Sequence, residues 1–307
     1  MTPGQSELPQ PAAEALRRWG ASPLEYLGGR SNQHWLVESQ RSRLVLRGYP
    51  VEPLGDIAYE LAVLSRLRAM GWPVPVLVEE PIQVEGRTWC SFTWLPGQPP
   101  ARGPGERHAR GRLLAELHDS TASLVDMGQR QGFCLSDEVV RDPELVSALQ
   151  EYERIYPADG HLLRWHLDQI REGFESIDLD NAETIVLHSD FSPWNLLFES
   201  EKLTGVLDFE ATHLNYRVAD FAMSWRGYQD ELIDGYQEVH KLTDLDWQLL
   251  IPAYWSWLFI GLKSEIKAIT SGKVPPHRFE WTINHLMRRS GLLAQRAPTY
   301  PGLQSRA

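Results

Sequence analysis

The sequence predicts an α+β protein of two lobes, a small β-rich N-terminal lobe and a larger, mainly helical C-terminal lobe. The first ~95 residues alternate short Val- and Leu-rich stretches with a single helical stretch. A stretch dense in proline and glycine follows, LPGQPPARGPG, and helical periodicity dominates after it. The expected parts are an N-terminal extension with a short helix at 1–20, an N-lobe at 21–96, a C-lobe at 97–296 and a loose tail at 297–307.

Each element of the first lobe follows from a local pattern. A short helix is expected at Ala12–Trp19. Residues 56–70 place apolar side chains at helical spacing, and Asp56 precedes them as a candidate N-cap. Runs rich in Val, Leu and aromatic residues, separated by polar or glycine turns, predict strands. These strands are expected at His34–Glu38, Arg43–Arg47, 74–80 and 87–95.

The second lobe is expected to be helical apart from one segment. The segment 185–211 predicts a strand at 186–187 and a hairpin of strands at 195–198 and 204–207. From Tyr228 onward the pattern is helical and aromatic, and we interpret most of these aromatic residues as helix–helix core. The expected helices lie at 106–119, 142–155, 161–177 and 281–293.

Composition narrows the class of protein. The chain has 307 residues and a formal net charge of −11, which argues against general binding to nucleic acid or to an anionic membrane. Its two cysteines, Cys90 and Cys134, form no CxxC pair, so a reducing compartment, the cytoplasm, is expected. No apolar run suits a signal peptide or a transmembrane helix. The oligomeric state is left open.

The segment IVLHSDFSPWNLLFESEKLTGVLDFEA, residues 185–211, concentrates polar side chains at strand ends. Asn195 and Asp208 lie at the two adjacent ends of the expected hairpin, and Asp190 lies in the loop before it. One amide and one carboxylate suit Mg²⁺, which takes few protein ligands beside water and substrate phosphates. A further carboxylate can accept a proton from an attacking hydroxyl. Each residue alone, like His188, would more often be a turn or core residue, but the joint spacing favours phosphoryl transfer.

The motifs HSDFSPWN and VLDFE resemble the catalytic and metal-binding segment of the aminoglycoside phosphotransferase and choline kinase family, which has a protein-kinase-like fold. Type II homoserine kinases look nearest. The resemblance implies Asp190 as catalytic base, Asn195 and Asp208 as Mg²⁺ ligands, and His188 and Asp220 as support of the catalytic loop. A position of Asp220 as N-cap of the helix that begins FAMSW is compatible with this supporting role. Ser189 stands where the family usually has a glycine, so the backbone there is less free.

The same resemblance implies ATP binding by the first lobe. LGGRSNQHW is similar to the family's glycine loop, whose N–H groups can cradle phosphates. LVLRGYP places Arg47 where a phosphate-binding residue is expected, with Glu60 on the next helix as its partner. FTWLPGQP is similar to the hinge that meets adenine. The implied nucleotide-binding residues are Gly28, Gly29, Ser31, Asn32, Arg47, Glu60, Phe92, Thr93, Trp94 and Leu95.

The acceptor is the open question. The family reading predicts transfer of the γ-phosphate to a hydroxyl of an amino alcohol, a homoserine-like metabolite or an aminoglycoside. Acidic residues would suit a cationic acceptor, and a basic residue would anchor a carboxylate. The candidates are Glu210, Arg217 and Arg226, with Asp230, Glu231, Lys263 and Glu265 as further possibilities. The alternative is a pseudokinase that binds nucleotide without transfer. A protein kinase is disfavoured because only 12 positions separate Asp208 from Asp220.

Overall fold

The computed structural model describes residues 9–29, 31–40 and 42–301, so the expectations for the extreme ends of the chain lie outside it. The described residues form two compact units. Unit 1 contains the residues up to Pro100 together with Pro193–Ala211. Unit 2 contains Ala101–Ser192 and the residues from Thr212 onward. The division differs from the expected one, which placed 193–211 in the C-lobe.

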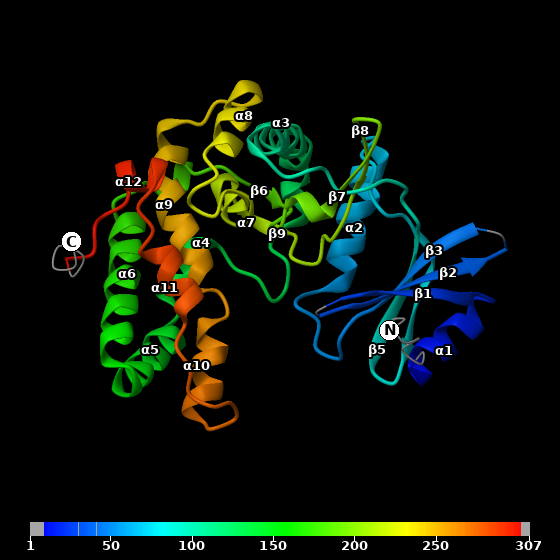
Figure 1. Cartoon of the computed structure of the whole chain (residues 1–307), viewed down its shortest axis with the longest axis horizontal. Helices are drawn as coiled ribbons and strands as arrows, with labels where there is room; N and C mark the ends of the chain where they lie inside the picture. The colour runs from blue at the N-terminus through cyan, green and yellow to red at the C-terminus, as the bar shows by residue number, and fades with distance from the viewer. Residues whose placement is uncertain (1–8, 30, 41, 302–307) are drawn as a thin grey trace. The chain divides into compact units, whose positions relative to one another are not determined.

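Unit 1 is built on a five-stranded antiparallel sheet in the order β1-β2-β3-β5-β4. β2 and β3 pair without a bulge, with His34 opposite Arg47 and Trp35 opposite Leu46. Figure 1 shows this sheet with α1 and α2 on either side of it. The elements are α1 (Gln10–Arg18), β1 (Ser22–Gly28), β2 (Gln33–Ser39), β3 (Ser42–Gly48), α2 (Ile57–Ala69), β4 (Leu77–Val84) and β5 (Arg87–Thr93).

The two faces of this sheet have different chemistry because side chains alternate along each strand. On one face, Trp35, Leu46 and Trp89 pack with Ala12 and Leu16 of α1 into a buried apolar cluster. The opposite face carries the alternate positions of β2 and β3. The alternation of side chains therefore buries the face toward α1 in the apolar core. The opposite face of the sheet remains available for a binding site.

Helix α2 begins where its sequence predicts. The Asp56 side chain accepts a hydrogen bond of 3.0 Å from the Ala58 N–H, which confirms the expected N-cap. The helix buries Glu60 together with the apolar residues Val63, Leu64 and Leu67. Glu60 is thus a carboxylate in an otherwise apolar helix face, which requires a partner.

The hairpin of 193–211 completes unit 1. It holds β7 (Leu196–Glu199) and β8 (Lys202–Val206) after a short 3₁₀ turn, Pro193–Asn195. The Phe198 N–H donates to the Gln98 carbonyl at 2.9 Å, and the Val206 N–H donates to the Pro73 carbonyl at 2.8 Å. These bonds attach the hairpin to the first hundred residues and explain its membership of unit 1.

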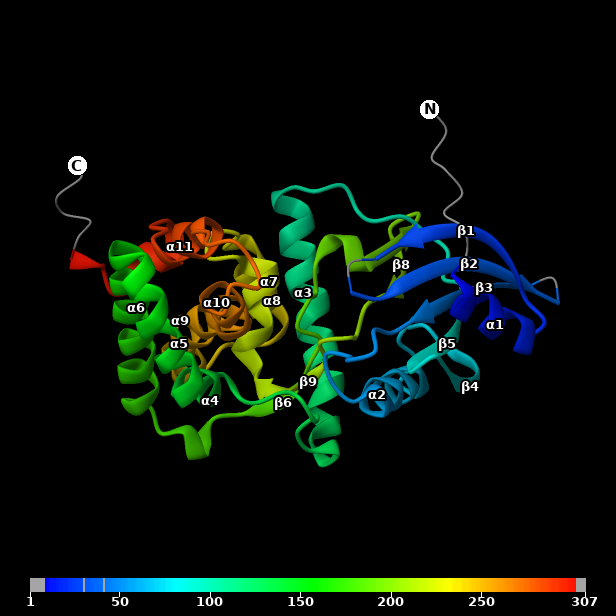
Figure 2. The same ribbon diagram turned by 90° about the horizontal axis from the view of Figure 1, so that it is seen from below.

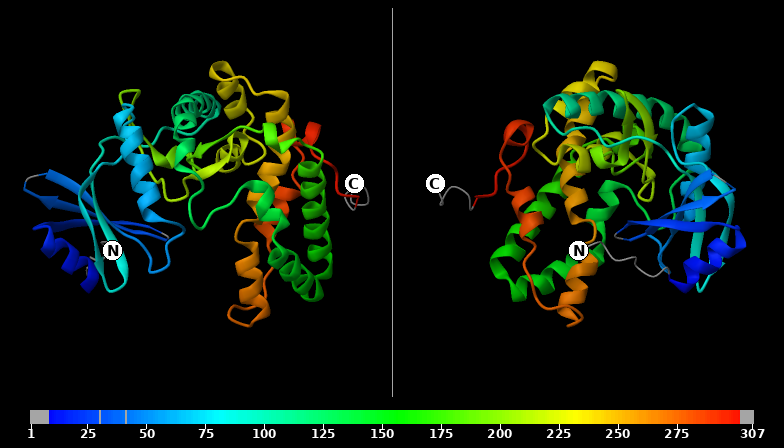
Figure 3. Two further views of the ribbon diagram at one scale, coloured as in Figure 1. Left: turned by 180° about the vertical axis from the view of Figure 1, so that it is seen from behind. Right: turned by 45° about the vertical axis from the view of Figure 1, so that its right-hand side comes forward.

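Unit 2 is mainly helical and holds a two-stranded sheet of β6 and β9. Figure 3 shows α6 in green beside α9 in orange, and Tyr254, Trp255 and Phe259 of α9 are buried, in line with the core interpretation. No described helix is long and apolar enough to cross a membrane. The elements are α3 (Pro104–Thr121), α4 (Ser136–Arg141), α5 (Pro143–Ile155), α6 (Pro157–Glu175), β6 (Thr184–Leu187), β9 (His213–Tyr216), α7 (Phe221–Trp225), α8 (Glu231–Val239), α9 (Asp244–Phe259), α10 (Leu262–Thr270), α11 (Glu280–Leu286) and α12 (Gly291–Arg296).

Two expectations for unit 2 were wrong. Strand β9 was not predicted, because HLNY is short and mixes polar with apolar residues; pairing with β6 makes it a strand. The single helix expected at 281–293 is two helices, α11 and α12. Ser290 is extended, with φ −147° and ψ 150°, and Gly291 has φ 46°, so the helix cannot run through them.

Helices α3 and α8 pack at glycine contacts (Figures 1 and 2). A Cβ at Gly111 would lie 1.9 Å from the Leu232 carbonyl oxygen, and a Cβ at Gly235 would lie 2.0 Å from the His108 carbonyl oxygen. We expect Gly111→Ala to lower the free energy of unfolding by about 1–3 kcal/mol or more, because the helices must separate. Urea unfolding measures this. Gly105→Ala is the matched control, since no atom lies within 4 Å of its added Cβ; equal stability of the two variants would contradict the packing argument.

The burial of His166 predicts that the free energy of unfolding of the protein depends on pH. Its ring is buried edge-on to Trp255 at 4.9 Å between centroids, and burial lowers its pKa to about 4. The unfolded chain binds a proton near pH 6.5, so the free energy of unfolding should fall as the pH drops from 6.5 to 4. We expect His166→Phe to remove up to roughly 3 kcal/mol of this fall. Urea unfolding at pH 7, 6 and 5 tests this, and an unchanged pH dependence in the variant would refute it.

Candidate active site

A cavity of about 490 Å³ lies in unit 1, on the sheet face opposite α1. Most of the expected nucleotide-binding residues line it, and Ser31 and Asn32 do not. The lining residues are Leu27, Gly28, Gly29, His34, Val45, Arg47, Glu60, Leu64, Pro75, Phe92, Thr93, Trp94, Leu95, Trp194, Asn195, Leu197, Leu207, Asp208 and Phe209. The hairpin of 193–211 therefore supplies part of the wall of the same cavity as the sheet.

The cavity has apolar walls formed by residues such as Val45, Phe92 and Leu207. Beside these walls, the N–H of Thr93 donates to the Val76 carbonyl at 2.9 Å. The N–H of Trp94 donates to the Arg43 carbonyl at 3.4 Å. Both of these donors are therefore already used by hydrogen bonds within unit 1.

Among the described residues that line the cavity, Arg47 carries the permanent positive charge, and the predicted ion pair with Glu60 is present. Its Nη1 lies 2.8 Å from a Glu60 carboxylate oxygen, with both side chains buried. Its Nη2 lies 3.5 Å from Asp208 and 3.4 Å from Glu210. Burial alone would lower the pKa of Arg47, but the neighbouring negative charges, led by Glu60, raise it above its ordinary value. The guanidinium is therefore permanently charged and held at the cavity wall.

Glu210 and Asn32 contact each other. The Asn32 amide donates to the Glu210 carboxylate, which also faces Arg47. Burial and the adjacent Asp208 raise the pKa of Glu210. Glu210, a candidate for acceptor binding by sequence, thus connects the glycine loop to the segment after Asp208.

Asn195 and Asp208 lie at adjacent ends of the hairpin, as the sequence predicts. The Leu207 N–H donates to the Asn195 carbonyl at 2.8 Å, and both side chains line the cavity. Asp208 has φ 65°, a left-handed conformation that is uncommon outside glycine. An amide oxygen beside a carboxylate is a donor set that fits Mg²⁺.

Sequence reasoning missed His34. It lies opposite Arg47 on the adjacent strand and lines the cavity. Its Nδ1 lies 3.3 Å from the Gly28 carbonyl oxygen, and burial, with the charge of Arg47, lowers its pKa to about 4. Strand alternation places positions 34 and 47 on one face only when the register between the two strands is known, and the pattern of a single strand does not specify that register.

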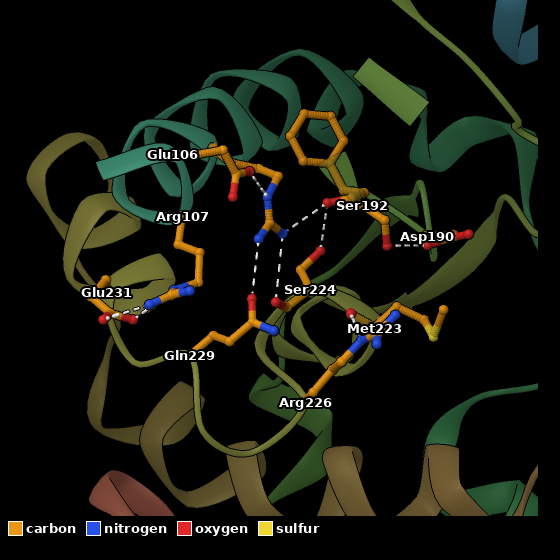
Figure 4. Close-up of polar contacts among 11 residues, drawn as sticks. Glu106, Arg107, Asp190, Ser192, Met223, Ser224, Arg226, Gln229 and Glu231 are labelled. Carbon is orange, nitrogen blue, oxygen red and sulfur yellow. Dashed lines mark hydrogen bonds and ion pairs between the residues drawn. The ribbon is translucent and has the colours of Figure 1, made fainter. Parts of the chain in front are cut away.

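Asp190 lies in unit 2, in the loop after β6. The Ser192 hydroxyl donates to its carboxylate (Figure 4). The N–H of Asp190 donates to His188 Nδ1 at 3.2 Å. Ser189 has φ 70°, which explains why a glycine would be the easier residue there. The loop therefore holds Asp190 through local contacts on both sides.

Asp220 is fully buried behind this loop. Its carboxylate accepts hydrogen bonds from the N–H groups of His188 at 2.8 Å and Ser189 at 2.6 Å. It also contacts His118 Nε2 at 2.9 Å, and His118 Nδ1 lies 2.9 Å from the Tyr236 hydroxyl. Burial would raise the pKa of Asp220, but His118 and the loop N–H groups lower it. Asp220 stands at the N-cap position of α7, but its side chain binds the loop and makes no capping bond to that helix.

The basic acceptor candidates differ in how they are held. Arg217 is buried in an ion pair with Glu183. Lys263 lies 2.7 Å from Asp142 of the α4–α5 junction. Arg226 is half-buried at the end of α7, has φ 53°, and donates from Nε to the Met223 carbonyl at 3.0 Å (Figure 4). The loop that carries Asp190 contacts the end of α7, because the Ser224 hydroxyl donates to the Phe191 carbonyl at 2.7 Å. Arg226 lies two residues after Ser224.

The acidic candidates of unit 2 serve structural contacts or face outward. Asp230 accepts from the Trp225 indole at 2.6 Å and from the Leu292 N–H at 3.0 Å. Glu231 binds Arg107 at 2.9 and 3.0 Å. Glu265 is exposed on α10.

Residues 24–248 match the phosphotransferase enzyme family. The chain belongs to this family. The resemblance found in the sequence is therefore confirmed, and the protein is a phosphotransferase. A homoserine kinase of Xanthobacter autotrophicus is 25% identical over 234 residues, 70% of this chain and 70% of the relative. A homoserine kinase of Methylobacterium nodulans is 30% identical over 165 residues, 50% of this chain and 47% of the relative.

Solved structures share the fold of this phosphotransferase. A microcompartment-associated aminopropanol kinase aligns with a TM-score of 0.62 and 17% identity, covering 89% of this chain and 93% of that one. An aminoglycoside phosphotransferase in a ternary complex with ADP and hygromycin B aligns with a TM-score of 0.62 and 16% identity, covering 94% and 99%. The predicted α+β, protein-kinase-like fold is thus confirmed.

Proposed function

We propose that this phosphotransferase is an ATP- and Mg²⁺-dependent kinase of a small hydroxylated molecule that carries a carboxylate, such as homoserine. The observation that supports it best is the cavity of unit 1, where the glycine loop, the buried Arg47–Glu60 pair and Asn195 with Asp208 meet. A phosphoryl-transfer enzyme needs these parts together.

The cavity fits a nucleotide in size and in polarity. About 490 Å³ lies in the range of small-molecule sites. A planar base suits the apolar end between Val45 and Phe92, and a polyphosphate suits the end with Arg47 and the glycines. Asn195 and Asp208 would hold Mg²⁺, which when bound neutralises phosphate charge and orients the phosphates.

Asp190 is the proposed general base. A carboxylate can accept the proton of an acceptor hydroxyl as it attacks, which typically contributes a 10²–10⁴-fold rate factor. Asp220 and His118 would keep the loop in place through the two N–H contacts, and Ser192 would orient the carboxylate. The loop is thus pre-organised by buried hydrogen bonds.

Arg226 is the proposed anchor for the acceptor carboxylate. Arg226 is half-buried and lies two residues after Ser224, whose hydroxyl binds the loop that carries Asp190. Arg217 and Lys263 form ion pairs with Glu183 and Asp142. A guanidinium binds a carboxylate with two parallel hydrogen bonds. The structural use of Asp230 and Glu231 disfavours a polycationic antibiotic, and the homoserine kinase relatives support the same choice.

ADP release from Mg-ATP should be measured with acceptors paired by their carboxylate. One pair is homoserine and 3-amino-1-propanol; aminoglycosides and choline complete the panel. We expect homoserine to be the better acceptor, and Arg226→Gln to raise its KM at least about 10-fold with the KM for ATP unchanged. Preference for acceptors without a carboxylate would contradict the substrate class. ATP binding without transfer to any acceptor would favour the pseudokinase alternative.

A further inference from the structure

Arg110 is buried in unit 2, and Figure 4 labels three of its hydrogen-bond partners, Glu106, Ser224 and Gln229. Its side chain, on α3, is 2% exposed. Nη1 donates to the carbonyls of Phe191 at 3.1 Å and Ser224 at 3.5 Å, and Nη2 donates to the Gln229 side chain at 3.3 Å. One guanidinium therefore binds the catalytic loop, the end of α7 and the loop that follows it.

The charge of Arg110 is compensated within its own helix. Nε lies 2.6 Å from Glu106, one turn earlier, and that carboxylate is also buried. A buried guanidinium costs free energy unless it is paired and hydrogen-bonded. The planar fork of arginine reaches several acceptors at once, which a lysine ammonium cannot reproduce. An arginine at position 110 is therefore suited to joining several chain segments by hydrogen bonds, and not only to filling space in the core.

The two carbonyls that Arg110 binds belong to residues that lie close in sequence to the proposed base and to the proposed carboxylate anchor. Phe191 follows Asp190, the proposed base, and Ser224 lies two residues before Arg226, the proposed carboxylate anchor. The Ser224 hydroxyl also donates to the Phe191 carbonyl at 2.7 Å, so the two segments are joined twice. We infer that Arg110 is a positioning residue that sets the spacing between the base and the acceptor anchor, an inference that rests on the proposed function.

This spacing determines which acceptor hydroxyl can react. An acceptor held by its carboxylate places its hydroxyl at a distance fixed by its chain length. Homoserine, serine and 5-hydroxynorvaline differ by one methylene each. A shift of about 1 Å can change the rate on the order of 10²-fold. Weakening the contacts of Arg110 with the Phe191 and Ser224 carbonyls should therefore lower the rate of transfer. It should also reduce the difference in rate between these three acceptors.

The test compares Arg110→Lys and Ser224→Ala with Arg107→Gln. Arg107 lies on the same helix but pairs with Glu231. For Arg110→Lys we expect kcat with the best acceptor to fall on the order of 100-fold, and its advantage over the other two chain lengths to shrink at least about 10-fold. The KM for ATP should stay unchanged, and ATP hydrolysis without transfer should rise. Ser224→Ala, which keeps the buried ion pair, should shift each quantity in the same direction by a smaller factor.

The outcomes distinguish the positioning role of Arg110 from the proposed function of the protein. A folded Arg110→Lys with the kcat and acceptor selectivity of Arg107→Gln would overturn the positioning role. If Arg110→Lys does not fold, Ser224→Ala decides, and wild-type selectivity in that variant overturns it. A wild-type enzyme that transfers to no acceptor in the panel would instead refute the proposed function, and the inference with it.

Discussion

Asp190→Asn is expected to abolish most phosphoryl transfer while leaving nucleotide binding intact. The amide keeps the shape of the side chain and can still accept from the Ser192 hydroxyl, but it cannot take the proton of the acceptor. We expect kcat to fall about 10²–10⁴-fold, the usual contribution of a general base. The affinity for an ATP analogue should not change, because the residues proposed to bind it lie in unit 1. Coupled ADP-release kinetics and calorimetric titration measure the two quantities.

The control for this variant is Asp180→Asn, which makes the same change at an exposed position of unit 2. It should behave as the wild type in both measurements. If Asp190→Asn retained most of the wild-type kcat, the base would have to be another group. If it lost nucleotide affinity as well, the substitution would have disturbed more than the proton transfer.

Glu60→Gln is expected to affect both stability and nucleotide affinity. The substitution leaves the Arg47 charge buried without its nearest counter-charge at 2.8 Å. Breaking a buried ion pair by removing one partner costs about 3–5 kcal/mol in stability. Arg47 would turn further toward Asp208 and Glu210, which lie 3.5 and 3.4 Å away, and would be less available to phosphates. We therefore expect the Kd for ATP to rise at least about 10-fold.

Glu80→Gln provides the comparison, since Glu80 is exposed on β4 of the same unit. Urea unfolding and calorimetric ATP titration of both variants separate the loss of a buried partner from a change in net charge. The prediction fails if the two variants are equally stable and bind ATP equally well.

The sequence predicted those parts of the site that depend on local pattern. The cap of α2 by Asp56 and the neighbouring positions of Asn195 and Asp208 follow from the order and length of single elements. The Arg47–Glu60 pair is implied by the family resemblance, and the structure contains it. His34 depended on register across two strands, which no single-strand pattern specifies. Strand β9 depended on a partner strand distant in sequence.

The remaining misses have the same physical origin. His118 reaches Asp220 across 102 positions, and Arg110 reaches Phe191 across 81. Contacts of this kind are set by how helices pack, and periodicity shows only which face of a helix is buried. The assignment of 193–211 to unit 1 is a further case, because it rests on bonds to Pro73 and Gln98.

The discontinuity of unit 1 has a consequence for biosynthesis. When Pro100 is joined to the growing chain, Asn195, Leu197, Leu207 and Asp208 of the cavity have not yet been made. Translation at roughly 5–20 residues per second separates the two portions by about 5–20 s. A nascent chain stalled before the hairpin should therefore bear an unfinished pocket, with its apolar wall open to chaperones. If this cavity binds ATP as proposed, ATP can stabilise the complete pocket only after the hairpin has left the ribosome, late in synthesis or after it.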